Sequence, residues 1–274
     1  MTSSSLTSRG GLTAAPRASI AIAPRATLST LVLIAALLLS PGVARAQAPA
    51  PAPMPVVEAA PPPSAAPVSL GGRNFSRWAF VERAVVARSE PRATSEGLVR
   101  LSTRTPERTH NLVVVLERQE VDGEPWVRVR LPMLPNDTTG WIPRTALGGY
   151  EKVVTHLYVD TRRHRLRLER RGRTVLRAPI GVGQRRWPTP TGEFYVRNEL
   201  RGFESPAYGP VAFGTSARSA VLTDWPGGGF VGIHGTNRPA LIPGRISHGC
   251  IRLRNRDILR LARMMPVGTP ITIG

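Results

Sequence analysis

Beyond residue 72, only one segment of the chain has the apolar spacing of an amphipathic helix. Asn255 is a suitable N-cap for this helix and Pro266 a suitable stop. Its apolar face comprises Ile258, Leu261, Ala262 and Met265. The other segments are short apolar or alternating runs separated by Gly, Pro and Asp-Gly turns, which is the pattern of strands. The chain is therefore expected to be mainly β.

The first 46 residues have the composition of a signal peptide. Basic residues without any acid precede an apolar run over 28–39, and Ala44-Arg45-Ala46 fits a cleavage site. The apolar run is shorter than the roughly 20 residues that a membrane-spanning helix needs. We expect a signal peptide at 1–46 and an exported protein, with an uncleaved N-terminal anchor as the alternative.

Residues 47–72 are rich in proline and alanine, with eight prolines between Pro49 and Pro67. Such a segment has too few large apolar side chains to form a core, and we expect an extended linker.

Residues 73–150 contain several strand patterns and no cluster of catalytic side chains. Asp122-Gly123 is a hairpin signal, residues 126–131 alternate as a half-buried strand does, and Gly140-Trp141-Ile142-Pro143 closes the segment. A small β-barrel is expected. The Trp-Val-x-Val and Gly-Trp-Ile-Pro motifs resemble those of a bacterial SH3-like domain, which implies either contact with the cell wall or a spacer that packs on the domain that follows.

Residues 151–274 are long enough for a second domain. Its strand patterns comprise a three-strand meander over 157–180 and single strands over 194–196, 230–233 and 270–273. The strand over 230–233 ends at His234. Residues 202–229 are rich in Gly, Pro and Ser, and we expect an irregular covering loop that includes Trp225.

Cys250 is the only cysteine in the chain. In an exported protein a lone thiol has no intramolecular disulfide partner, so it is dispensable, pairs with another molecule or is chemically active. A free cysteine has a pKa of about 8.5 and needs a base or a positive charge nearby to attack at neutral pH. Either His248, two residues away, or His234, from a separate strand, is a candidate base. His234 can approach the sulfur from across a pocket.

Gly249 permits a tight turn next to this thiol. In such a turn the backbone amides of His248, Gly249 and Cys250 can converge on one oxygen, as an oxyanion hole for acyl transfer requires. A zinc site at His234, His248 and Cys250 is less well supported, because structural zinc usually has four ligands and no further cysteine is present. An unreactive, buried Cys250 is the remaining alternative. We expect no metal and no cofactor.

The histidine and cysteine motifs together resemble the L,D-transpeptidase (YkuD-type) catalytic domain. They read Ile233-His234-Gly235-Thr236-Asn237 and Ser247-His248-Gly249-Cys250-Ile251-Arg252. Gly181-Val182-Gly183 and the segment from Thr189 to Phe194 add to the resemblance, which spans about residues 153–273. It implies a β-sandwich with a short capping helix, preceded in this chain by the small SH3-like barrel.

By position, the resemblance makes Cys250 the nucleophile and His234 the general base and acid, oriented by the Gly235 carbonyl. Arg252 becomes a contact for a substrate carboxylate. The residues expected to shape the pocket and hold the oxyanion are Gly235, Ser247, His248 and Gly249.

The activity implied is the exchange of peptide bonds in peptidoglycan stem peptides. Cys250 would form a thioester with a donor stem, and the amine of a second stem would resolve it into a 3–3 cross-link. Three alternatives remain open: an L,D-carboxypeptidase, a transferase that anchors an envelope protein to peptidoglycan, and a non-catalytic wall-binding protein.

The positive charge of the chain reflects mainly its arginine-rich composition, with attraction to an anionic surface outside the cytoplasm as a secondary effect. The leader carries four arginines and no acid, so its removal lowers the formal net charge from +19 to +15. The remaining arginines are dispersed and do not indicate nucleic-acid binding. We expect stem peptides as partners, glycan as a partner of the SH3-like domain, and a periplasmic or wall-associated location without a transmembrane segment in the mature chain.

Overall fold

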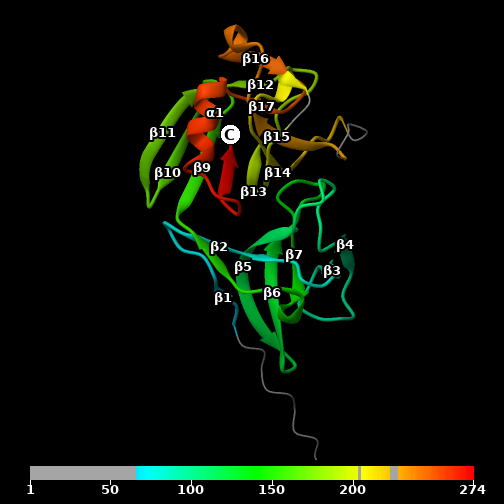
Figure 1. Cartoon of the computed structure of the whole chain (residues 1–274). Coiled ribbons are helices and arrows are strands. Elements are labelled where there is room, and N and C mark those ends of the chain that lie inside the picture. The colour runs from blue at the N-terminus through cyan, green and yellow to red at the C-terminus, as the bar shows by residue number, and fades with distance from the viewer. Residues whose placement is uncertain (1–65, 203–204, 223–227) are drawn as a thin grey trace, which may run out of the picture. The chain divides into compact units, whose positions relative to one another are not determined.

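The computed structural model describes residues 66–202, 205–222 and 228–274 (Figure 1). The expected signal peptide, the linker up to residue 65 and Trp225 lie outside these residues. Within them strands dominate, and the one α-helix is α1 (Asn255–Ala262). The prediction of a mainly β chain is confirmed. None of the helices in the described part is long and apolar enough to cross a bilayer.

Residues 66–153, here called the N-terminal β domain, form an eight-stranded sheet in the order β4-β3-β7-β6-β5-β2-β8, with β1 paired to β5. The strands are β1 (Val68–Ser69), β2 (Ser76–Phe80), β3 (Val85–Arg88), β4 (Gly97–Leu101), β5 (Leu112–Val121), β6 (Glu124–Arg130), β7 (Thr139–Pro143) and β8 (Glu151–Val153). Val113, Val127 and Ile142 are completely buried in its core.

The hairpin signal at Asp122-Gly123 is confirmed. Both residues have positive φ, 52° and 76°, as the type I′ turn between two strands requires. The ends of the sheet differ from the sequence expectation, because β1 lies within the expected linker and β8 within the expected second domain. The SH3-like classification of residues 73–150 stays a prediction.

Residues 155–273 form a ten-stranded sheet in the order β11-β10-β9-β18-β13-β14-β15-β17-β12-β16. The strands are β9 (Thr155–Asp160), β10 (Arg165–Arg170), β11 (Arg173–Pro179), β12 (Gly181–Gly183), β13 (Gly192–Leu200), β14 (Ala212–Arg218), β15 (Phe230–His234), β16 (Gly244–Ser247), β17 (Ile251–Arg252) and β18 (Pro270–Ile273). The meander over 157–180 and the strands at 230–233 and 270–273 are confirmed.

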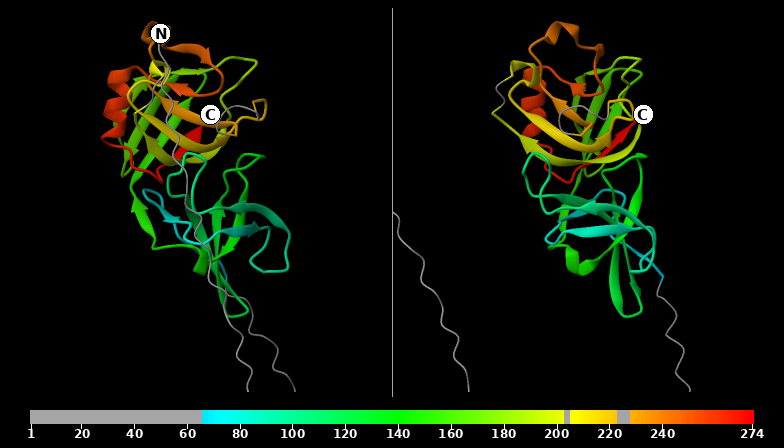
Figure 2. Two further views of the ribbon diagram at one scale, coloured as in Figure 1. Left: turned by 45° about the vertical axis from the view of Figure 1, so that its right-hand side comes forward. Right: turned by 90° about the vertical axis from the view of Figure 1, so that its right-hand side faces the viewer.

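Strand β13 joins the two halves of this sheet (Figure 2). Its residues 192–195 pair with β18 and its residues 196–200 pair with β14. One hydrophobic core contains residues of both halves and of α1, among them Leu157, Leu168, Ile233, Ile251 and Ile258. The domain is therefore a β-sandwich with a short helix packed on its core.

Two details of the sequence interpretation are wrong. Strand β14 lies inside the segment expected to be an irregular loop. Phe213 and Ala217 face the core, but Thr215 between them is polar and most other residues of the strand are small, so no apolar alternation is visible in the sequence. The N-cap of α1 is Arg254, so Asn255 is the first helical residue.

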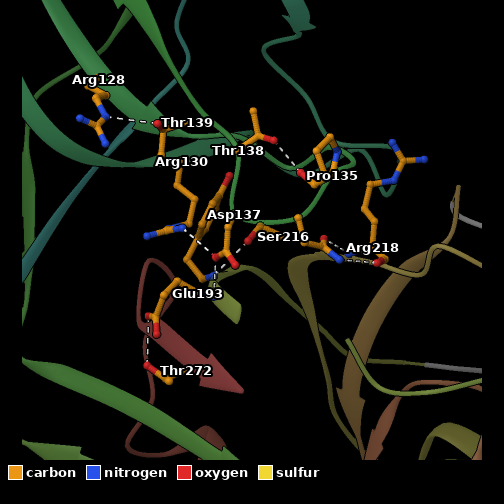
Figure 3. Close-up of polar contacts among 12 residues, drawn as sticks. Arg128, Arg130, Pro135, Asp137, Thr138, Thr139, Glu193, Ser216, Arg218 and Thr272 are labelled. Atoms are coloured by element: carbon orange, nitrogen blue, oxygen red, sulfur yellow. Dashed lines mark hydrogen bonds and ion pairs between the residues drawn. The ribbon is translucent and has the colours of Figure 1, made fainter. Parts of the chain in front are cut away.

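The N-terminal β domain contacts the sandwich through a small apolar cluster. Trp78, Leu112, Val114 and Val153 pack with Tyr195 of β13, whose hydroxyl donates to the Leu112 carbonyl at 3.2 Å. Polar contacts also join the two domains (Figure 3). Asp137 accepts the backbone N–H of Glu193 at 2.6 Å.

Gly268 allows Trp78 to approach the sandwich closely, and replacement of this glycine tests the contact. A Cβ at position 268 would lie 2.1 Å from Trp78 Cδ1, and the residue has φ of 75°. We expect Gly268→Ala to reduce the free energy of unfolding by about 1–3 kcal/mol, because the indole must move and the backbone is strained. Thermal unfolding of the purified protein measures this.

Gly149→Ala is the matched control, because a Cβ there meets no atom within 4 Å and φ is not left-handed. Equal melting temperatures for the two variants would contradict the close contact at Trp78.

Candidate active site

Two neighbouring parallel strands bring Cys250 and His234 to one face of the sandwich. Ile233 pairs with Ile251 and His234 with Arg252, so Cys250 lies level with Gly232. The backbone N–H of Gly232 donates to Cys250 Sγ at 3.4 Å. Residues two apart on a strand face the same way. His234 therefore lies on the same face as Cys250, two residues beyond Gly232 on the neighbouring strand.

Gly232 leaves the space between these two side chains open. A Cβ at this position would lie 3.9 Å from Cys250 Sγ and 4.0 Å from His234 Cδ2. The sequence interpretation did not single out this glycine. Gly232 lies two residues before His234 in the strand Phe230–His234, and this spacing could have placed it on the same face as the histidine.

His234 is buried and its ring is held by the next residue. Nδ1 lies 2.7 Å from the Gly235 carbonyl oxygen. A carbonyl only accepts hydrogen bonds, so Nδ1 carries a proton and Nε2 of the neutral ring is left as an acceptor. The expected contact between His234 and the Gly235 carbonyl is present in the structure.

Burial shifts both ionisable groups toward their neutral forms. It lowers the pKa of His234 from 6.5 to about 4, against the opposing effect of the Gly235 carbonyl and with a smaller lowering by the charge of Arg252. Burial also raises the pKa of the Cys250 thiol, although the Gly232 N–H and Arg252 act in the other direction. At neutral pH the resting site therefore contains a thiol and an uncharged imidazole.

The turn that carries Cys250 is fixed by two hydroxyl groups. Ser247 Oγ donates to the Cys250 carbonyl at 2.6 Å and accepts the Gly249 N–H at 3.1 Å. Thr189 Oγ1 donates to the Gly249 carbonyl at 2.8 Å and accepts the Gly183 N–H at 2.9 Å. Gly249 has φ of 116°, a conformation that favours glycine. Because Ser247 takes the Gly249 amide, that amide is not directed at a ligand.

The sulfur and the imidazole open into a cavity of about 310 Å³. Its lining comprises Ser205, Ala207, Tyr208, Ser219, Leu222, Gly229, Phe230, Val231, His234, His248, Cys250 and Arg252. Of the seven residues predicted from the sequence, four line it: Cys250, His234, His248 and Arg252. The other three, Gly235, Ser247 and Gly249, support the backbone behind it.

Arg252 and His248 reach the cavity in different ways. Arg252 faces it from β17, and its Nε is buried without a hydrogen-bond partner among the described residues. His248 is exposed, and its ring centroid lies 4.0 Å from that of Trp187.

The sequence interpretation missed two further groups at the site. Tyr208 lines the cavity with its ring centroid 5.0 Å from that of His234, and the Thr189 hydroxyl fixes the cysteine turn. Among the described residues, no group of three or more His, Cys, Asp or Glu side chains has a metal-binding arrangement.

Residues 154–273 match the family model of the YkuD L,D-transpeptidase catalytic domain. A Bacillus subtilis protein named "Putative L,D-transpeptidase YkuD" is 38% identical over 118 residues, which are 43% of this chain and 65% of the relative. An Escherichia coli protein named "Probable L,D-transpeptidase YbiS" is 34% identical over 116 residues, 36% of this chain and 37% of the relative. The chain thus covers less than two thirds of either relative.

Among solved structures, the Enterococcus faecium L,D-transpeptidase C442S mutant is 26% identical with a TM-score of 0.35, and the match covers 44% of this chain and 49% of that one. The family match and the sequence relatives agree with the motifs around His234 and Cys250. Over residues 154–273 this chain is thus similar to the L,D-transpeptidase catalytic domains of the YkuD family.

Proposed function

We propose that this protein is a cysteine-dependent L,D-transpeptidase that forms 3–3 cross-links between peptidoglycan stem peptides. The observation that carries the proposal is the placement of Cys250 and His234 on one face, across Gly232, in the wall of a single cavity. A nucleophile and a base that share an open pocket are the minimum machinery for acyl transfer.

The neutral resting pair defines the order of proton transfers. Cys250 attacks the carbonyl carbon of the bond before the terminal D-alanine while His234 Nε2 takes the thiol proton. His234 then gives this proton to the departing amine, and a thioester remains on Cys250. The amine of a second stem attacks the thioester, loses a proton to His234 and releases the thiol.

The negative charge of the tetrahedral intermediate needs a donor on the cysteine turn. Since Ser247 holds the Gly249 amide, we assign this role to the backbone N–H of Cys250. Arg252 is the proposed contact for a stem carboxylate, because the residue lines the cavity and a guanidinium binds carboxylates well.

The acceptor decides between related activities of the same thioester. Water would make the protein an L,D-carboxypeptidase, and a protein lysine would make it an anchoring enzyme. Among these activities, cross-linking is the one that the resemblance to L,D-transpeptidases favours. The proposal includes export by the signal peptide at 1–46 and action in the periplasm or at the wall, where the N-terminal β domain has glycan as a candidate ligand.

Incubation of the purified protein with tetrapeptide muropeptides, followed by mass spectrometry, tests the proposal. We expect a cross-linked dimer that has lost one D-alanine. Cys250→Ser should abolish it, and His234→Ala should slow it about 10²–10⁴-fold because the base is removed.

His110→Ala is the matched control, since His110 belongs to the N-terminal β domain and does not line the cavity. Tripeptide alone would instead identify a carboxypeptidase. The absence of any product, together with no acylation of Cys250 by a carbapenem, would favour the non-catalytic wall-binding protein.

The charge state of the resting thiol is tested by the pH dependence of its alkylation. Burial holds the pKa of Cys250 above its ordinary value and that of His234 at about 4, so thiolate forms only as the pH rises past the ordinary range of a thiol. We expect the rate of iodoacetamide labelling, followed by mass, to increase continuously with pH through neutrality and into the alkaline range.

A thiolate–imidazolium pair would give a different profile, with a plateau across neutral pH that His234→Ala removes. Observation of that plateau would contradict the neutral pair. Slow alkylation at neutral pH agrees with an active enzyme here, because the base acts when the substrate arrives.

A further inference from the structure

The hairpin between β14 and β15 forms one wall of the cavity. The residues of this hairpin that line it are Ser219, Leu222, Gly229, Phe230 and Val231. Ser219 N–H donates to the Gly229 carbonyl at 2.8 Å and closes the described part of the hairpin. The shape of the cavity next to Cys250 therefore depends on what holds the base of this hairpin.

Two arginines hold the ring of Phe230. The guanidinium carbons of Arg197 and Arg218 lie 3.9 and 5.0 Å from the ring centroid. Arg218 pairs with Phe230 across the hairpin and donates to the Gly228 carbonyl at 2.6 Å. Cation–π contacts are stronger where water is excluded, and the Arg197 side chain is 2% exposed.

The N-terminal β domain supplies a partner for each of these arginines. Arg197 is the extra residue of a bulge in β13, and its Nη2 lies 3.4 Å from Glu107 Oε2. The same Glu107 oxygen accepts the side-chain amide of Asn198 at 3.1 Å. Bulges redirect side chains, and here the bulge directs a buried cation toward Phe230 and Glu107.

Asn136 binds the backbone of Arg218 in the manner of a neighbouring strand. Its Oδ1 accepts the Arg218 N–H at 3.0 Å, and its Nδ2 donates to the Arg218 carbonyl at 2.9 Å. Figure 3 shows the dashed contacts at Arg218 beside those that join Asp137 to Glu193. Arg218 is the last residue of β14, so the amide of Asn136 holds the hairpin at its base.

We propose that the N-terminal β domain is a positioning element of the catalytic site. Asn136 and Glu107 fix Arg218 and Arg197, these fix Phe230, and Phe230 sets the wall against which the donor stem lies. Only the predicted effect on KM rests on the proposed transpeptidase function. Domain adhesion alone does not require these contacts, because the apolar cluster around Trp78 and Tyr195 already joins the two domains.

The test compares Asn136→Ala with Tyr195→Phe in the full chain. Tyr195→Phe also removes a hydrogen bond between the domains, but it lies outside the hairpin and the cavity. Hydrogen exchange followed by mass spectrometry reports the hairpin directly. We expect the amides of 217–222 and 228–231 to exchange about tenfold faster in Asn136→Ala than in Tyr195→Phe at equal global stability.

Kinetics with the tetrapeptide donor supply the second readout. The KM of Asn136→Ala should rise about tenfold with a smaller change in kcat, because binding to the wall is lost while Cys250 and His234 are intact. Glu107→Gln should act in the same direction. Asn136→Asp keeps the acceptor for the Arg218 N–H and should restore part of the protection.

Equal exchange of the hairpin in Asn136→Ala and Tyr195→Phe would overturn the proposal. Because exchange is measured without turnover, this result is separate from a failure of the proposed function, which would appear as an inactive parent protein. Faster exchange with an unchanged KM would also overturn it, since Phe230 would then not position the donor.

Discussion

The parallel pairing of β15 with β17 is the interaction on which the site depends. It sets Cys250 beside Gly232 and His234 beside Arg252, although the two segments are separated along the chain by a turn and another strand. A shift of one residue in this register would turn Cys250 away from His234, because side chains alternate along a strand. The hydroxyls of Ser247 and Thr189 secure the turn that begins this pairing.

Burial then decides the chemistry of the pair. Both groups lose water as the sandwich closes, and an ion pair at this depth would have to offset the desolvation of two charges. In the proposed reaction, the neutral thiol and imidazole avoid that cost until a substrate carbonyl arrives. The Gly232 N–H and Arg252 favour the thiolate as it develops, so the same surroundings that keep the resting site neutral also assist the attack.

Much of the architecture and the candidate reactive residues could be predicted from the sequence. Period-two patterns predicted the meander and the strand that ends at His234, and the lone cysteine that follows two histidine motifs predicted the candidate site. Strand β14 was missed because small residues conceal its alternation. Gly232 and Thr189 were missed because their roles arise from neighbours distant in sequence, Cys250 for the first and Gly183 with Gly249 for the second.

The empty space at Gly232 has a consequence for how the proposed activity can be lost. A methyl group there meets its neighbours at ordinary contact distances, so alanine fits without disturbing the sandwich. It would nevertheless lie 3.9 Å from Cys250 Sγ and 4.0 Å from His234 Cδ2, beside the route of the proposed proton transfer from sulfur to nitrogen. On the proposed mechanism, a protein so altered would keep its fold while the transfer of the proton would be hindered. Loss of the proposed activity at this position would therefore not be accompanied by a loss of stability.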